Sequence, residues 1–268
     1  MAPSTDTDSS RQGATPARPP LVTTRGDLRT LEFVAGEVQS EMRLSRPSAL
    51  VLAYSRAMMC FALFVPRPRH ILMVGLGGGS LAKFCYRHFP QARITVLELR
   101  ADVIALRDEF RVPPDDARFT VLHADATAYL AGVPDSVDVL LVDGFDAAGL
   151  PPALGSSKFY ADCRRALRHG GVLTANIFSY DPLYPAMLGR LRLTFGGQVC
   201  WFEKVAGNNR ILFAVKAPLD TTATAAAPPR GRALLVLDFI ARRRRLGFGI
   251  LNRLLVIALV AYLERRRF

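Results

Sequence analysis

Short apolar strands alternate with helical segments between residues 70 and 217, and this alternation constrains the fold more than any other feature. Each expected strand is five or six residues long, almost continuously apolar, and followed by a segment with helical periodicity. Such strands are typical of a parallel sheet covered by helices on both faces. The expected strands are residues His70–Val74, Arg93–Glu98, Phe119–His123, Val137–Val142 and 172–177.

Two further strands are expected near the end of this region, at residues 199–204 and 210–216, joined by a turn at residues 207–209. They suggest one antiparallel strand at the edge of the sheet. The pattern is that of the α/β class I methyltransferase-like, or Rossmann-like, fold. Ligands of such sheets bind outside the carboxyl ends of the strands, so functional residues are sought there.

The chain divides by composition into five parts. A leader rich in Ser, Thr, Pro and Ala, without the apolar core of a signal peptide, is expected to be disordered. Two short strands joined near Ala35-Gly36 predict a small N-terminal β-hairpin, and Pro47 is expected to start a helix that ends before Pro66. The parts are residues 1–28 (leader), 29–46 (hairpin), 47–217 (catalytic domain), 218–230 (linker) and 231–268 (basic and apolar helical tail).

The formal net charge of +12 is concentrated in the tail. Residues 230–268 hold ten arginines against two acids, whereas the other 229 residues hold 25 basic and 21 acidic side chains. The high isoelectric point is therefore weak evidence for nucleic-acid binding, and no nucleic-acid partner is expected. Four widely spaced cysteines without a CxxC pair argue against a disulfide framework or a zinc site, so we expect a cytoplasmic protein without a metal.

A glycine-rich turn follows the first strand of the alternation, in the stretch ILMVGLGGGSLAKF. Glycines allow a tight turn and a close approach of the backbone to a ligand, although many such turns only link a strand to a helix. The next strand ends in Glu98, nineteen residues after Gly79, and an acid there can accept hydrogen bonds from ribose hydroxyls. Together, the glycine-rich turn and Glu98 favour an adenosyl-binding site over a purely structural turn.

Acidic residues also follow the third and fourth strands. Asp125 can accept a hydrogen bond from an adenine amino group or cap the helix that starts near Thr127, and these roles are compatible. Asp143 and Asp146 lie three residues apart in one loop, where they can hold a cationic amine and accept its proton. Alternatively, Asp143 caps a turn and Asp146 is solvated.

Taken in order, these segments resemble the spermidine synthase (polyamine aminopropyltransferase) family. The resemblance runs from about Val38 to Lys216. The occurrence of several matching segments in the same order is more specific than any single motif. The matching segments are EVQSEM, LAYSRAMM, VGLGGGS, VLELR, LHADA, LLVDGFD and the pair Phe159-Tyr160.

The resemblance implies a homodimeric enzyme in which a putrescine-like amine attacks decarboxylated S-adenosylmethionine, or an S-adenosylmethionine-type relative, and releases methylthioadenosine. Asp143 is then the proton acceptor, Asp146 helps to hold the amine, Glu98 binds ribose and Asp125 binds adenine. Tyr54 and Ser80 belong to the substrate pocket. The implied cofactor residues are Gln39, Gly75, Gly77, Gly78, Glu98, Leu99, Asp125 and Ala126.

Two departures from the family pattern affect the acceptor side. Ser80 stands where the family usually has an Asp, and Tyr54-Ser55-Arg56 replaces Tyr-His-Glu. A site with less negative charge should bind a diamine less well. Two alternatives therefore stay open: an S-adenosylmethionine-dependent methyltransferase on the same fold, and a non-catalytic adenosyl-binding relative.

The tail has an apolar segment at residues 246–263, interrupted by Asn252 and Arg253 and flanked by arginines on both sides. Three interpretations compete. The segment packs as a helix on the domain or on a dimer partner, lies on an anionic membrane surface, or crosses the bilayer. Peripheral membrane contact through the tail is thus one expectation.

Overall fold

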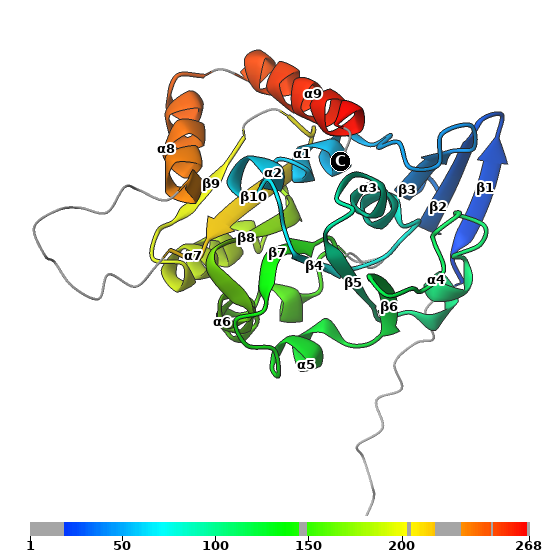
Figure 1. Cartoon of the computed structure of the whole chain (residues 1–268), viewed down its shortest axis with the longest axis horizontal. Coiled ribbons are helices and arrows are strands. Elements are labelled where there is room, and N and C mark those ends of the chain that lie inside the picture. Colours follow the sequence, from blue (N-terminus) through cyan, green and yellow to red (C-terminus); the bar gives the residue numbers. More distant parts are fainter. Residues whose placement is uncertain (1–18, 145–148, 203–204, 218–231, 248, 267–268) are drawn as a thin grey trace, which may run out of the picture.

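The structure is a computed structural model, and it describes residues 19–144, 149–202, 205–217, 232–247 and 249–266. These residues form a sheet of seven strands surrounded by helices and a separate sheet of three strands at one end of the molecule (Figure 1).

The seven-stranded sheet confirms the predicted α/β fold. Its first five strands in the chain are parallel, and β10 is antiparallel to both of its neighbours. The antiparallel strand lies one position inside the edge, because β9 pairs with its outer side. The spatial order is β6 (Phe119–His123), β5 (Arg93–Glu98), β4 (His70–Val74), β7 (Val137–Val142), β8 (Leu167–Phe178), β10 (Asn209–Val215) and β9 (Val199–Trp201).

Alternate side chains of the buried strands feed two separate cores. In β4, Ile71 and Met73 join the core on one face, while Leu72 and Val74 join the core on the other. The first face carries α1 (Ala53–Met58), α2 (Phe61–Phe64), α3 (Ser80–His88), α4 (Ala101–Ala105), α8 (Arg232–Arg245) and α9 (Gly249–Arg265). The second carries α5 (Ala126–Leu130), η1 (Pro152–Gly155), α6 (Ser157–Ala166) and α7 (Tyr184–Thr194).

The smaller sheet has three antiparallel strands where the sequence predicted a two-stranded hairpin. Its strands are β1 (Leu21–Arg25), β2 (Leu28–Val34) and β3 (Glu37–Arg43). The first strand falls within the predicted leader, whose residues 1–18 lie outside the described residues. Two features favour β1. Its sequence LVTTR is rich in the β-branched residues Val and Thr, and the turn at Gly26, where φ is +57°, connects it to β2.

The helix expected from Pro47 to Pro66 is instead two short helices, α1 and α2. Leu52 is extended at the start of α1, and the guanidinium of Arg56 donates to the carbonyls of Leu50 and Val51 at 2.9 and 2.6 Å. These carbonyls are satisfied by a side chain, so the segment before α1 does not need helical hydrogen bonds.

The tail packs on the domain, as the first of the three interpretations proposed. α8 lies against α2 and the β8–β10–β9 end of the sheet, and α9 lies against α1 (Figure 1). Ile240 of α8 and Val256, Val260 and Leu263 of α9 are buried in the core. Within the described ranges, no helix combines the length and the apolar character that crossing a membrane requires. The predicted linker lies outside the described residues.

Candidate functional site

A cavity of about 860 Å³ opens at the carboxyl ends of the parallel strands, beneath the edge of the small sheet. The strand ends supply its floor, and β2 and β3 supply one wall through Phe33, Gln39 and Ser40. This is the end of the sheet where the sequence placed the ligand.

The glycine turn follows β4 and contributes Gly75, Leu76 and Gly77 to the cavity. Gly75 has a φ of +93°, and a Cβ there would overlap the backbone carbonyl of Asp143. Gly77 has a φ of +51°, and a Cβ there would meet the Cβ of Ser40 at 3.7 Å, an ordinary contact distance. Gly78 does not line the cavity, because its position is closed by the side chains of Phe110 and Ser40, each 2.7 Å from where a Cβ would lie.

Glu98 ends β5 and faces the cavity from a buried position. One carboxylate oxygen accepts from the backbone N–H of Leu76 at 2.8 Å, and the other accepts from the N–H of Arg100 at 2.9 Å. Each oxygen keeps a second lone pair for a ligand hydroxyl. Leu99, also in the cavity wall, is strongly exposed there.

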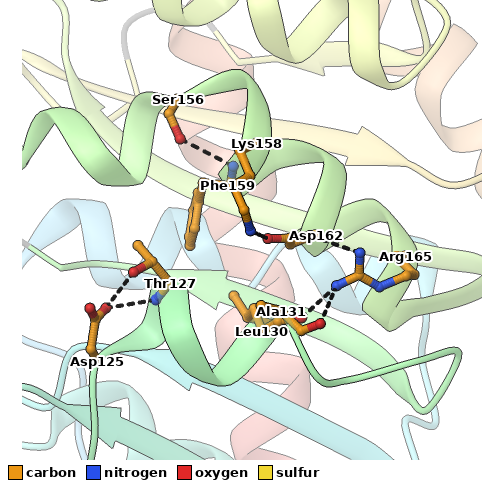
Figure 2. A network of polar contacts seen from close by, with 9 residues as sticks. All are labelled: Asp125, Thr127, Leu130, Ala131, Ser156, Lys158, Phe159, Asp162 and Arg165. Atoms are coloured by element: carbon orange, nitrogen blue, oxygen red, sulfur yellow. Dashed lines mark hydrogen bonds and ion pairs between the residues drawn. The ribbon is translucent and has the colours of Figure 1, made fainter.

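Asp125 caps α5 and lines the cavity together with Ala126. Its Oδ1 accepts from the N–H and the hydroxyl of Thr127, both at 2.8 Å, as Figure 2 shows. The capping role is thus confirmed and uses one oxygen, and the same residue lines the cavity, where the adenine-binding role stays a prediction.

The other end of α5 is held by α6 (Figure 2). Arg165 donates to the carbonyls of Leu130 and Ala131 at 3.0 and 2.8 Å, and it pairs with the buried carboxylate of Asp162 at 2.8 Å. A guanidinium at the C-terminus of a helix satisfies its last carbonyls. Both ends of the helix that carries Asp125 are thereby fixed.

Asp143 follows β7 and is the most perturbed acid of the cavity. Its Oδ1 accepts from the side-chain amide of Asn176 at 2.9 Å, and Asn176 in turn accepts from the amide of Asn209 at 2.9 Å. Burial of the carboxyl raises the pKa of Asp143 to about 6, against the opposing effect of hydrogen bonds from Asn176 and Tyr54.

Tyr54 lies beside Asp143 in the cavity wall. Its hydroxyl is 3.3 Å from the carbonyl of Gln39, and it also forms a hydrogen bond with Asp143. Burial, followed by the negative charge of Asp143, raises the pKa of Tyr54 well above its usual value. The hydroxyl therefore stays protonated and can donate to the Asp143 carboxylate.

The two sequence departures have different structural consequences. Ser80 starts α3 and lines the cavity, with its hydroxyl 3.3 Å from that of Ser40 and 3.4 Å from the carbonyl of Glu41. Arg56 and Ser55 do not line the cavity: the arginine binds the backbone before α1, and the hydroxyl of Ser55 donates to Leu52. Arg56 thus does not place its positive charge in the cavity.

Sequence reasoning missed four polar residues of the cavity wall. Asn176 lies inside the expected strand 172–177, whereas candidates were sought only after strand ends. Asn209 starts β10, Glu37 starts β3 within the quoted EVQSEM segment but was not singled out there, and Asp181 lies in a loop that carried no motif. Asp146 lies outside the described residues, so its predicted role is not tested by the structure.

The described lining of the cavity is strongly acidic. Its carboxylates are those of Glu37, Glu98, Asp125, Asp143 and Asp181. Against these five, Arg100 is the basic side chain among the described lining residues; it pairs with Asp102 and lies over the ring of Phe33. Such a cavity attracts cations. No three His, Cys, Asp or Glu side chains gather as a metal site within the described ranges.

Comparisons with known proteins agree with this geometry. The model of the spermine/spermidine synthase domain matches residues 51–182. A polyamine aminopropyltransferase of Neisseria meningitidis serogroup A is 39% identical over 180 residues, 66% of this chain and 68% of the relative. One of Chromobacterium violaceum is 37% identical over 196 residues, 73% of this chain and 75% of the relative.

A solved structure shows the same fold. The probable spermidine synthase of Corynebacterium glutamicum superposes with a TM-score of 0.65 at 24% identity, covering 77% of this chain and 80% of that one. At this identity the likeness supports the fold, whereas the two bacterial relatives carry the family relationship.

Proposed function

Because the chain belongs to the spermidine synthase family of polyamine aminopropyltransferases, we propose that it transfers the aminopropyl group of decarboxylated S-adenosylmethionine to a putrescine-like amine. The enzyme is a transferase of the spermidine synthase type. The observation that carries the proposal is the acidic cavity in which Asp143, with its raised pKa, is held between Asn176 and Tyr54.

The donor lies along the ends of β4, β5 and β6 in this proposal. Glu98 accepts from the ribose hydroxyls with its remaining lone pairs, and Asp125 accepts from the adenine amino group while it caps α5. Gly75 and Gly77 let the backbone approach the donor, because no side chain stands there. Leu99 and Ala126 complete the apolar surroundings of the adenosine.

The acceptor lies between Asp143 and the wall formed by Tyr54, Gln39 and Ser80. Its nitrogen attacks the methylene carbon next to the sulfonium; the C–N bond forms, the C–S bond breaks, and the electron pair leaves with neutral methylthioadenosine. An alkylammonium has a pKa near ~10 and must lose a proton before it attacks. Asp143 is the proposed proton acceptor, and Asp146 is proposed to hold the amine.

Positioning and charge account for most of the catalysis in this scheme, since the sulfonium is already a good leaving group. The amides of Asn176 and Asn209 fix the Asp143 carboxyl in one orientation. The negative lining concentrates the cationic amine, and the buried setting brings the carboxyl pKa closer to that of the amine.

The test is to incubate the full chain with decarboxylated S-adenosylmethionine or S-adenosylmethionine and a panel of diamines. Methylthioadenosine that depends on added amine supports the proposal. S-adenosylhomocysteine would instead identify a methyltransferase, and binding of methylthioadenosine without either product would identify a non-catalytic adenosyl-binding protein.

Asp143→Asn is expected to lower turnover at least ~100-fold, because the amide cannot accept the proton, while methylthioadenosine still binds. Asp108→Asn provides the matched control, since it makes the same chemical change on the exposed side of the α4 region. Unchanged turnover in Asp143→Asn would refute the role given to this carboxylate.

A further inference from the structure

α9 is apolar on its covered side and along much of its open side, where Arg253, Glu264 and Arg265 are its charged residues. The inner side packs on the domain through Val256, Val260 and Leu263. On the opposite side, Ile250, Leu254 and Ile257 are 78%, 56% and 55% exposed. Contiguous exposed apolar side chains on a helix mark an interaction surface more often than chance exposure does, so this open side fits a further surface.

The exposed apolar side chains form a continuous stripe, named here the outer stripe: Ile250, Leu254 and Ile257. At about 100° per residue they lie within roughly 60° of one another around the helix. Leu251 and Tyr262 widen the stripe on one flank, at 48% and 59% exposure. An apolar surface of this extent is more than the scattered hydrophobic residues that protein surfaces normally carry.

Positive charge surrounds the outer stripe. Arg253 and Arg265 are exposed on its two flanks, each about 60° around the helix from Ile250. Glu264 is the acid of this helix, and it is paired with Arg46 at 3.7 Å. The described parts of α8 and α9 and the residues that follow them carry eight arginines and two acids.

Further arginines lie near the C-terminal end of α9. A hollow of about 590 Å³ beside the α2–β4 connection is bordered by Arg67, Arg69 and Arg266. An occupant of the outer stripe must therefore supply an apolar layer in the middle and negative charge around it.

From this complementarity we propose that the outer stripe of α9 docks the protein on an anionic lipid bilayer, with the helix lying parallel to the surface. The apolar side chains enter the boundary between headgroups and acyl chains, and the flanking arginines contact lipid phosphates. A second copy of the chain is a poorer occupant, because a two-fold interface through this face sets the arginines of both copies against each other.

The test is flotation of the full chain with vesicles of phosphatidylcholine alone and of phosphatidylcholine mixed with phosphatidylglycerol. The chain is expected to float with the anionic vesicles and to stay behind with the neutral ones, and added salt is expected to weaken the binding by screening. Each arginine in contact with the surface contributes about a fivefold gain in binding.

The stripe variant Ile250→Ser/Leu254→Ser/Ile257→Ser is expected to bind anionic vesicles at least about tenfold more weakly. The charge variant Arg253→Gln/Arg265→Gln is expected to lose binding to anionic vesicles without changing the apolar stripe. Leu193→Ser is the matched control, because Leu193 is 86% exposed on α7 and outside the stripe. Circular dichroism and thermal unfolding check that each variant is folded.

The proposal fails if the parent chain does not float with anionic vesicles, if it floats equally with neutral ones, or if the stripe variant floats like the parent. Light scattering tests whether a second copy of the chain covers the stripe instead. If the parent is a dimer that does not bind vesicles, and the stripe variant is a monomer, the stripe is a dimer interface.

Discussion

At the scale of single residues, the site depends on side chains that each satisfy a structural and a chemical requirement. Asp125 caps α5 with one oxygen while it borders the cavity, and Gly75 makes room for the carbonyl of Asp143. Glu98, Asp125 and Asp143 were predicted as site residues because each stands at or just after the end of a strand. Their partners Asn176 and Asn209 were not predicted, because Asn176 lay inside an expected strand and Asn209 in an expected turn, and neither belonged to a motif.

The double role of Asp125 can be separated by two substitutions. Asp125→Ala is expected to destabilise the fold by about 1 kcal/mol through loss of the cap, whereas Asp125→Asn keeps the cap because Asn caps equally well. Both are expected to weaken binding of methylthioadenosine, since both remove the carboxylate. Thermal unfolding and calorimetric titration measure the two effects; equal stability of both variants would contradict the capping role.

The raised pKa of Asp143 predicts a pH-dependent stability. The folded state holds the Asp143 proton more tightly than the unfolded chain, so ionisation of this carboxyl costs the fold stability as pH rises from about 4 to about 6. Asp143→Asn is expected to be more stable than the parent by about 1–3 kcal/mol above pH ~6 and equal to it below pH ~4.

Urea unfolding across this pH range measures the difference, with Asp108→Asn as a control that should show no such pH dependence. A difference between the parent and Asp143→Asn that stays constant from pH 4 to pH 8 would contradict the assigned cause.

At the scale of elements, the sequence predicted the first four strands of the large sheet in chain order, β4, β5, β6 and β7, with their observed bounds. Nearly continuous apolar runs of this length are typical of strands in a parallel sheet covered on both faces, so their type and position were easy to predict. It did not reveal β1, because the composition of residues 1–28 as a whole hid the short LVTTR strand. The sequence analysis also assigned α8 to a separate tail, because local patterns do not show which distant side chains join the core of the domain.

The placement of α8 in the core gives a direct stability prediction. Ile240 is fully buried against the sheet, so Ile240→Ala is expected to lower the free energy of unfolding by about 2–4 kcal/mol. Leu254→Ala, on the exposed side of α9, is the matched control and is expected to change it by less than about 0.5 kcal/mol.

Denaturant unfolding compares the two variants, and a similar loss for both would mean that α9 is covered on its outer side. Truncation after Ala217 is a poorer test of the tail, because it also uncovers the sheet that α8 protects.

At the scale of the whole molecule, charge and chemistry are divided between two regions. The cavity is acidic and suits a cationic substrate, whereas α8 and α9 are basic and suit an anionic surface. The count of charges along the sequence predicted the basic tail, whereas the acidic lining of the cavity emerged only from the structure. The homodimer, the cytoplasmic location and the identity of the amine stay predictions, which light scattering, fractionation and the amine panel address.

The small sheet forms part of the cavity wall, and this has a consequence for how activity is lost. It is joined to the larger domain through the buried side chains of Leu31 and Met42 and by hydrogen bonds at its periphery, from Arg29 to the carbonyl of Glu109 and from Arg111 to the carbonyl of Leu44. Transient detachment of this sheet would dismantle one side of the pocket while the seven-stranded sheet stayed intact. Any such local opening would lower turnover before the seven-stranded sheet unfolds, so activity would be lost at a milder condition than the global fold.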